Sequence, residues 1–230
     1  IKILCSNKYF ILITLAFAII YTSLGLTGGS RIYYAKYVLG NEMINSTMTL
    51  FNYIPTILTI MLIPIFAKKF GKIKALFVGF LFYGAGLILE IAGPVNLPMI
   101  YGGLVLQGIG HAALYSCLFA IVGDVVDYSE WKDGIREEGL TYSVTSFGQK
   151  IGTGLGTAAL GWILAAGHYD GTAAVQSASA IFAIKGLFLY LPLVITVIVL
   201  IIWYLFMGID KIYPTVRKEL DERRKNVKQN

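Results

Sequence analysis

The chain has 230 residues, of which 57% are hydrophobic and 14% are charged, and its formal net charge is +6. Soluble domains carry about 25% charged residues, and this chain contains several apolar runs of about 20 residues that a soluble core does not need. Its basic residues border those runs, which favours membrane topology over a nucleic-acid partner. The composition therefore excludes a single water-soluble domain and predicts an all-α membrane protein in a lipid bilayer.

Six apolar segments are each long enough to cross a ~30 Å hydrocarbon core as a helix. A transmembrane β-barrel would instead show ~10-residue segments of alternating hydrophobicity. We expect a polytopic protein in which residues 1–209 form one six-helix bundle, and Pro55 and Pro64 are expected to bend or break the second span. In chain order, the expected spans are residues 10–29, 46–67, 75–93, 98–123, 139–166 and 186–207.

Polar residues occur inside the third and fourth expected spans. Glu90 lies near the outer end of the third, and its carboxylate is expected to reach toward the membrane interface. The fourth span carries Gln107, His111 and Tyr115 at four-residue spacing, which places them on one helical stripe. For His111, lining a polar cavity and bonding a neighbouring helix are equal alternatives, whereas the Tyr115 ring could also stack on the apolar face of a sugar.

The stretch DVVDYSEWKDGIREEG at residues 124–139 is rich in charge and predicts a short amphipathic helix at the membrane surface. Asp124 and Asp127 share a helical face, as do Asp127 and Glu130. Together with Arg136, these carboxylates could form ion pairs that open and close with an inner gate. A solvated loop whose ion pairs contribute little is the alternative.

The fifth expected span carries the strongest functional signal. At about 100° per residue, one face gathers the polar residues Tyr142, Ser146, Gln149, Lys150, Thr153 and Thr157. A neighbouring face has glycine at every fourth position, which lets another helix approach closely; these are Gly148, Gly152 and Gly156.

Lys150 lies roughly 16 Å along the axis of the fifth span from Gly139, at 1.5 Å per residue. That depth is near the middle of the bilayer, where an ammonium needs a carboxylate, a polar ligand or a water-filled cavity. We expect Lys150 to line a polar central cavity, with a structural ion pair to another helix as the alternative. Within this sequence Lys150 has no obvious carboxylate partner, which favours a further half outside it, as does a chain that starts at Ile1.

The basic residues predict an orientation. One side collects most of them, at positions 2, 8, 68, 69, 72, 74, 132 and 136 and in the tail, whereas the other side has only Arg31, Lys36 and Lys185. The positive-inside rule makes the crowded side cytoplasmic, so both termini are expected in the cytoplasm at the cell membrane. The charged tail of residues 210–230 is helix-compatible, and we expect it to be cytoplasmic and partly disordered.

The residues that could support catalysis are sparse. The sequence contains no recognisable nucleophile–base pair, phosphate-binding glycine loop or metal-ligand spacing. We therefore expect neither an enzyme nor a metal site nor a resident cofactor. Cys5 and Cys117 are far apart in the chain, and both are expected to be free thiols.

The stretch DVVDYSEWKDGIREEGLTYSVTSFGQKIGTGLG at residues 124–156 resembles the melibiose-carrier-like family of glycoside–pentoside–hexuronide:cation symporters, which belong to the major facilitator superfamily. The segments GGSRIYYAKYVLGN at residues 28–41 and AKKFGK at residues 67–72 add to the likeness. It extends over essentially the whole chain but matches only the carboxy-terminal six helices of a twelve-helix family.

The resemblance implies alternating access, in which two bundles rock around a central sugar site. By resemblance, Lys150 links the sugar to a coupling cation, Na⁺ or H⁺, while Ser146 and Gln149 lie beside the sugar and Tyr115 packs against it. Tyr142 and His111 complete the candidate substrate-binding set. The resemblance also implies that the cytoplasmic loop holds the two bundles together through its charged residues Asp124, Asp127, Glu130 and Arg136.

In this family the cation-binding acidic residues and most direct sugar ligands belong to the amino-terminal bundle, which these residues do not match. The expected partners are therefore a sugar or glycoside and an amino-terminal bundle, in the same full-length chain or a second copy. We expect the carboxy-terminal half of a cation-coupled sugar symporter. The alternatives are a transporter of a non-sugar substrate, such as a lysolipid or a drug, and a membrane scaffold or sensor that transports nothing.

Overall fold

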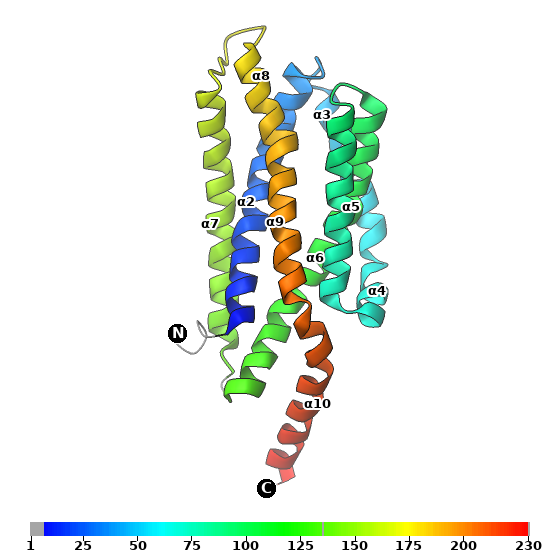
Figure 1. Cartoon of the computed structure of the whole chain (residues 1–230), viewed down its shortest axis with the longest axis vertical. Coiled ribbons are helices and arrows are strands. Elements are labelled where there is room, and N and C mark those ends of the chain that lie inside the picture. Colours follow the sequence, from blue (N-terminus) through cyan, green and yellow to red (C-terminus); the bar gives the residue numbers. More distant parts are fainter. Residues whose placement is uncertain (1–6, 135, 230) are drawn as a thin grey trace.

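The computed structural model describes residues 7–134 and 136–229, and within them every regular element is a helix. Successive long helices run in alternating directions and lie side by side, which confirms the all-α class (Figure 1). Lys2 and Cys5 fall outside the described residues. The elements are α2 Lys8–Tyr37, α3 Ile44–Ile60, α4 Ile63–Phe70, α5 Lys72–Ala92, α6 Leu97–Asp133, α7 Glu138–Ala166, α8 Ala178–Lys185, η1 Gly186–Tyr190, α9 Leu191–Phe206 and α10 Gly208–Gln229.

The first span is longer than expected. The Asn7 side chain caps α2 by accepting a hydrogen bond from the Tyr9 amide at 3.0 Å, as N-cap residues do. No proline interrupts the helix, which continues to Tyr37 instead of ending at residue 29. The last turns of α2 therefore contain residues 28–37 of the segment GGSRIYYAKYVLGN.

The second expected span is a bent pair of helices. α3 ends at Ile60, α4 begins at Ile63, and the two axes differ by 54°. Pro64 explains the break, because it has no N–H and its ring would clash with the Ile60 carbonyl one turn earlier. Pro55, by contrast, lies inside α3. The expected break is therefore confirmed, and it occurs at the second proline.

α6 corrects the expectation for residues 124–139. A separate surface helix was expected there, but α6 continues without interruption to Asp133. The apolar residues Val125 and Val126 are buried and extend the packed face of the helix. α6 ends at Gly134, whose φ of +71° is left-handed and whose N–H donates to the Glu130 carbonyl, a common glycine C-cap.

The last span starts at Ala178 and not at residue 186, because Ser177 caps α8 by accepting a hydrogen bond from the Ala180 amide at 3.1 Å. One π-helical turn, η1, precedes Pro192, and the Leu191 N–H donates to the Gly186 carbonyl there. Such a turn lets a helix pass a proline without a break. α8, η1 and α9 therefore form one continuous span, Ala178–Phe206.

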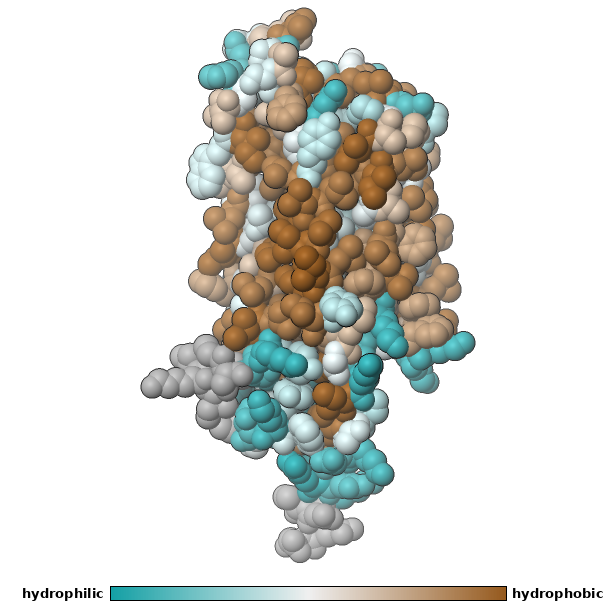
Figure 2. All heavy atoms as spheres, viewed as in Figure 1, coloured by the Kyte–Doolittle hydropathy of each residue, from teal (hydrophilic) through white to brown (hydrophobic). Residues whose placement is uncertain are grey.

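By length and composition, four helical segments within the described residues can each cross a membrane, namely α2, α5, α6 and the α8–α9 span, and the bent pair α3–α4 makes five. α7 is long enough, but its glycine- and threonine-rich sequence lowers its hydropathy. The count of six spans thus stays a prediction. An apolar band covers the middle of the face seen in Figure 2, and polar side chains gather at the ends.

The helices pack as two groups. α2 lies along α7, whereas α6 lies along α5 and α3. Large buried side chains from α2 and α9 fill the interior near the basic end, among them Tyr9, Phe17, Trp203 and Phe206. A second cluster around Tyr34, Leu104 and Leu187 fills the opposite end.

The charged tail forms a helix, α10, that runs to Gln229. The expectation of partial disorder is wrong for these residues, because an apolar stripe at Ile209, Val216 and Leu220 is buried and α10 packs against the lower part of α6. The Asp210 carboxylate also accepts hydrogen bonds from the Ile73 and Lys74 amides, each at 3.1 Å. The tail therefore caps the start of α5.

Candidate substrate-binding site and charged gate

The polar face of α7 is open. Ser146 and Lys150 are exposed, and with Tyr142, Ser143 and Phe147 they line a surface groove to which only α7 contributes. Gln149 is half-buried on the same helix. Among the described residues, no carboxylate lies within 4.0 Å of the Lys150 ammonium. These polar side chains therefore lie on one open face of α7, and their role in a substrate site stays a prediction.

The glycine face of α7 packs on α2. Gly148, Gly152 and Gly156 are buried, and a Cβ atom at Gly152 would collide with the Ala18 carbonyl oxygen. In return, a Cβ atom at Gly25 would lie 2.7 Å from the Thr153 carbonyl oxygen. The expected close approach is confirmed, and it turns the polar face of α7 away from the interior.

The expected polar stripe on α6 lies partly at the surface and partly in the interior of the bundle. Tyr115 is 45% exposed, whereas the Gln107 amide is buried and donates to Glu90 Oε1 at 2.7 Å. Glu90 itself is 0% exposed, so the expected reach toward the interface is wrong. Gln107, 17 residues further along the chain, binds Oε1 of the buried carboxylate, whereas its buried Oε2 has no hydrogen-bond partner among the described residues.

His111 bonds a neighbouring helix and also borders a small cavity. Its Nδ1 lies 3.3 Å from Asn52 Oδ1 on α3, and its ring centroid lies 5.8 Å from that of Tyr115. The cavity, of about 20 Å³, is lined mainly by apolar side chains of α2, α5, α6 and α9, and Ser23, Tyr83 and Thr196 line it besides His111. A space of that size holds about one water molecule, so it is far too small for a sugar.

Tyr115 and Lys150 lie at similar depth but on separate elements. The Phe17 ring on α2 packs edge-on against Phe119 of α6 with centroids 5.2 Å apart, and Gly148 of α7 faces the same part of α2. Tyr115 precedes Phe119 by about one turn, and Lys150 follows Gly148 by two residues. Both candidate groups therefore flank α2 midway along its length, although no hydrogen bond or ion pair joins them in the described part of the chain.

Arg31 is a candidate that the sequence analysis placed only among the outer basic residues. Its Nη1 donates to Thr49 Oγ1 on α3 at 3.4 Å, while its buried Nε has no hydrogen-bond partner among the described residues. The titratable side chains close enough to act on its charge are Tyr83, Tyr53, Glu90 and Tyr115. The signal in the sequence was an arginine surrounded by apolar and glycine residues.

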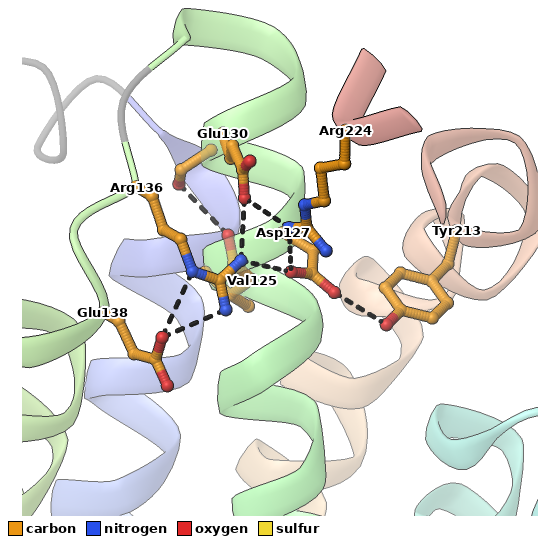
Figure 3. Close-up of polar contacts among 8 residues, drawn as sticks. Val125, Asp127, Glu130, Arg136, Glu138, Tyr213 and Arg224 are labelled. Atoms are coloured by element: carbon orange, nitrogen blue, oxygen red, sulfur yellow. Dashed lines mark hydrogen bonds and ion pairs between the residues drawn. The ribbon is translucent and has the colours of Figure 1, made fainter. Parts of the chain in front are cut away.

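Three of the four expected gate residues meet near the carboxy-terminal end of α6 (Figure 3). Arg136 Nη1 lies 2.7 Å from Glu130 and 2.9 Å from Asp127, and its Nη2 lies 3.0 Å from Glu138. These hydrogen bonds, above all the one that Arg136 donates to Glu130 and then the one to Asp127, raise the pKa of Arg136. The guanidinium is therefore charged at any working pH.

The tail helix α10 also contacts this group of charged residues, Asp127, Glu130, Arg136 and Glu138, which we call the gate cluster. Arg224 Nη2 lies 2.8 Å from Glu130, and the Tyr213 hydroxyl donates to Asp127 at 3.0 Å, as Figure 3 shows. Asp124, the fourth expected gate residue, is buried and instead pairs with Lys72 of α5 at 2.6 Å. The pairs seen here thus lie within this chain, and the role of these residues between two bundles stays a prediction.

Comparison with known proteins supports the sequence resemblance. Residues 1–211 match the family model described as MFS/sugar transport protein. An isoprimeverose transporter of Lactiplantibacillus pentosus is 31% identical over 82% of this chain and 37% of its own length. A glucuronide carrier protein homolog of Escherichia coli is 28% identical over 85% of this chain and 43% of its own length.

A third relative, from Salmonella typhimurium, is named as a candidate 2,3-dihydroxypropane-1-sulfonate exporter; it is 30% identical over 86% of this chain and 43% of its own length. The chain spans less than half the length of each of these relatives. All three are named for transport and none for catalysis, as expected for a chain that is not an enzyme. With most of its residues matched, this multi-pass membrane chain belongs to the MFS/sugar transport protein family.

Proposed function

We propose that this chain is the carboxy-terminal half of a cation-coupled sugar or glycoside symporter that works by alternating access. Family membership and the relatives' names support a transported solute of this class. The observation that carries the proposal is Lys150, which is exposed midway along α7 and has no carboxylate within 4.0 Å in the described residues. An ammonium at that depth requires an anion or a polar cavity.

A second six-helix bundle would supply the rest of the substrate site. In the proposal it covers the exposed face of α7 and belongs to the same full-length chain or to a second copy. Its carboxylates would bind the coupling cation, Na⁺ or H⁺, and neutralise Lys150. The protein would lie in the cell membrane with both termini in the cytoplasm, because the basic residues gather at the end where α2 begins and α10 lies.

The substrate-binding roles follow from chemistry. Ser146, Gln149 and Tyr142 carry groups that hydrogen-bond sugar hydroxyls, and the exposed Tyr115 ring can stack on the apolar face of a sugar. His111, held by Asn52, positions that ring from one turn away. The charge of the bound cation would act electrostatically on the Lys150 ammonium, so that sugar and cation stabilise one conformation jointly.

The gate role is proposed for Asp127, Glu130 and Arg136, and a supporting role is proposed for Asp124. Their ion pairs would close the cytoplasmic side and separate as the bundles rock open. Such pairs are individually weak when exposed, which suits contacts that must break in every cycle. Asp124, paired with Lys72, would anchor the lower end of α6 during that movement.

The test is solute counterflow in vesicles. We would compare this chain alone, this chain with a matching amino-terminal bundle, and that bundle alone, using a labelled neutral glycoside. The proposal predicts exchange only when both bundles are present. Exchange by this chain alone would contradict the half-transporter assignment, and no exchange in any vesicle for any glycoside would favour the scaffold alternative.

A second candidate substrate class is an acidic glycoside. The buried Nε of Arg31, which has no hydrogen-bond partner among the described residues, favours it, since guanidinium groups bind carboxylates well, and one relative is named a glucuronide carrier protein homolog. In the same vesicles, an acidic glycoside should then compete better than its neutral analogue, and Arg31→Gln should remove that preference. Equal competition would exclude this candidate and retain the neutral glycoside.

A further inference from the structure

An apolar groove opens on the flank of the bundle where α4 bends away from α3. Its volume is about 190 Å³, and no charged or polar side chain lines it. α4 contributes one wall and α5 the other, and α6 forms the floor. The side chains that define it most closely are Ile63 and Phe66 on α4, Val78 and Phe82 on α5, and Ile109 and Ala113 on α6.

The backbone explains why the groove stays open. α4 departs from the direction of α3 by 54°, and none of its residues is buried. At the floor, α5 and α6 touch closely, since a Cβ atom at Gly79 would lie only 2.5 Å from the Ala113 Cβ atom. One wall therefore stands away from the bundle while the other two elements are tightly joined.

Cations flank the end of the groove nearest the loop between α4 and α5. Lys74 precedes Val78 by one turn on α5, and Lys69 follows Phe66 by one turn on α4, so each lies below a residue of the lining. Lys68, at about 100° from Lys69 around the helix, lies on the side of α4 opposite the lining residues. All three ammonium groups belong to exposed side chains.

The carboxylates at this end are already used by other groups. Asp124 pairs with Lys72 at 2.6 Å, and Asp210 accepts hydrogen bonds from the Ile73 and Lys74 amides. Within the described residues, no carboxylate lies within 4.0 Å of the Lys69 or Lys74 ammonium. The groove therefore ends in positive charge that no carboxylate in residues 7–134 or 136–225 neutralises.

We propose that the groove binds one acyl chain of an anionic phospholipid whose phosphate is held by Lys69 and Lys74. The apolar lining fits a hydrocarbon tail, and the two cations select a negative headgroup over a zwitterionic one. Because the tail would rest on α4, α5 and α6 together, the bound lipid would brace the bent helix α4 against the bundle. Binding does not depend on the proposed transport function.

The test is native mass spectrometry of the whole chain after delipidation in detergent. Phosphatidylglycerol and phosphatidylcholine with the same oleoyl chains would be added in equal amounts. The wild-type chain should retain phosphatidylglycerol preferentially. Lys69→Ala/Lys74→Ala should weaken that retention roughly 30-fold, because each lysine near an anionic headgroup contributes about fivefold, whereas Lys68→Ala should change it little.

A second arm tests the groove itself. Val78→Trp fills the space with a larger side chain and should lower retention of the long-chain lipid, while binding of dihexanoyl phosphatidylglycerol should stay as in the wild type. Equal retention of the two headgroups would overturn the proposal. So would an equal effect of the Lys68 and the Lys69/Lys74 changes, or long-chain binding that Val78→Trp leaves intact.

Discussion

The Lys72 ammonium lies 2.6 Å from the Asp124 carboxylate. This pair joins α5 to α6 across 52 residues of sequence, beside the start of the tail helix. The Asp124 side chain is 6% exposed and that of Lys72 is 32% exposed. The two partners therefore differ in what their loss leaves behind, since only Asp124 would remain as a charge shielded from water.

Removing Lys72 should therefore cost more than removing both partners. Lys72→Met is expected to lower the free energy of unfolding by roughly 2 kcal/mol, less than the ~3–5 kcal/mol of fully buried pairs because Lys72 is partly hydrated. Lys72→Met/Asp124→Asn should recover much of that loss. Unfolding of the purified chain in detergent measures the stability of each variant. A double variant whose loss equals the sum of the losses in Lys72→Met and Asp124→Asn would contradict the pairing.

Asp210 should act as a cap from a distant part of the chain. Asp210→Ala leaves the Ile73 and Lys74 amides unpaired and should destabilise the chain by about 1 kcal/mol. Asp210→Asn keeps an acceptor of the same shape and should retain most of the stability at pH 7. If both variants unfold alike, the capping account fails.

The same carboxyl should make stability depend on pH. Burial raises the pKa of Asp210 and outweighs the hydrogen bonds from the Ile73 and Lys74 amides, which lower it. A raised folded pKa means that stability is fully present below the unfolded pKa of about 3.9 and is lost as pH rises through the folded pKa. The wild type should thus gain stability relative to Asp210→Asn as pH falls from 7 toward 4, and a difference independent of pH would be evidence against this shift.

The glycines of α7 offer a matched pair of substitutions. A Cβ atom at Gly156 would collide with the Thr22 carbonyl oxygen, whereas one at Gly154 would meet nothing within 4 Å. Gly156→Ala should force α2 and α7 apart and cost roughly 1–3 kcal/mol. Gly154→Ala should leave stability unchanged or raise it by up to about 1 kcal/mol through helix propensity. Equal thermal shifts for the two would contradict the packing described here.

The gate cluster should tolerate the loss of one arginine. Glu130 is held by Arg136 at 2.7 Å and by Arg224 at 2.8 Å, and exposed pairs contribute only about 0.2–1 kcal/mol each. Arg136→Gln should leave tail cleavage by trypsin unchanged, because the partners of Arg136 lie on α6 and α7. Arg224→Gln should speed cleavage at Lys211 and Lys218 only slightly, because the buried apolar stripe still holds α10 on the bundle. Fast cleavage in either variant would contradict this account.

The sequence predicted features that depend on local pattern. Apolar runs located the membrane helices, Pro64 located the break, and the glycine spacing on α7 predicted its tight contact with α2. The ends of α2 and α6 were missed because apolar character stops before the helix does. Val125 and Val126 continue the buried face of α6 into a stretch whose charges had indicated a separate element.

Features that depend on distant partners could not be predicted in this way. Glu90 is buried and accepts a hydrogen bond from the Gln107 amide on the next helix, and neither residue alone indicates the other. The tail is ordered because its stripe of Ile209, Val216 and Leu220 finds a surface on the bundle. Likewise, the sequence placed Arg31 only among the outer basic residues, and it gave no sign of the hydrogen bond from Arg31 to Thr49 on α3.

Lys150 tests the central claim most directly. In a complete transporter that contains these residues, we would measure accumulation of a labelled glycoside against its own gradient, with an imposed Na⁺ or proton gradient, in the wild type and in Lys150→Ala. Lys211→Ala, a change of the same kind in the tail, serves as the control. The account predicts that Lys150→Ala abolishes accumulation while the control retains it; normal gradient-driven accumulation by Lys150→Ala would contradict the assignment.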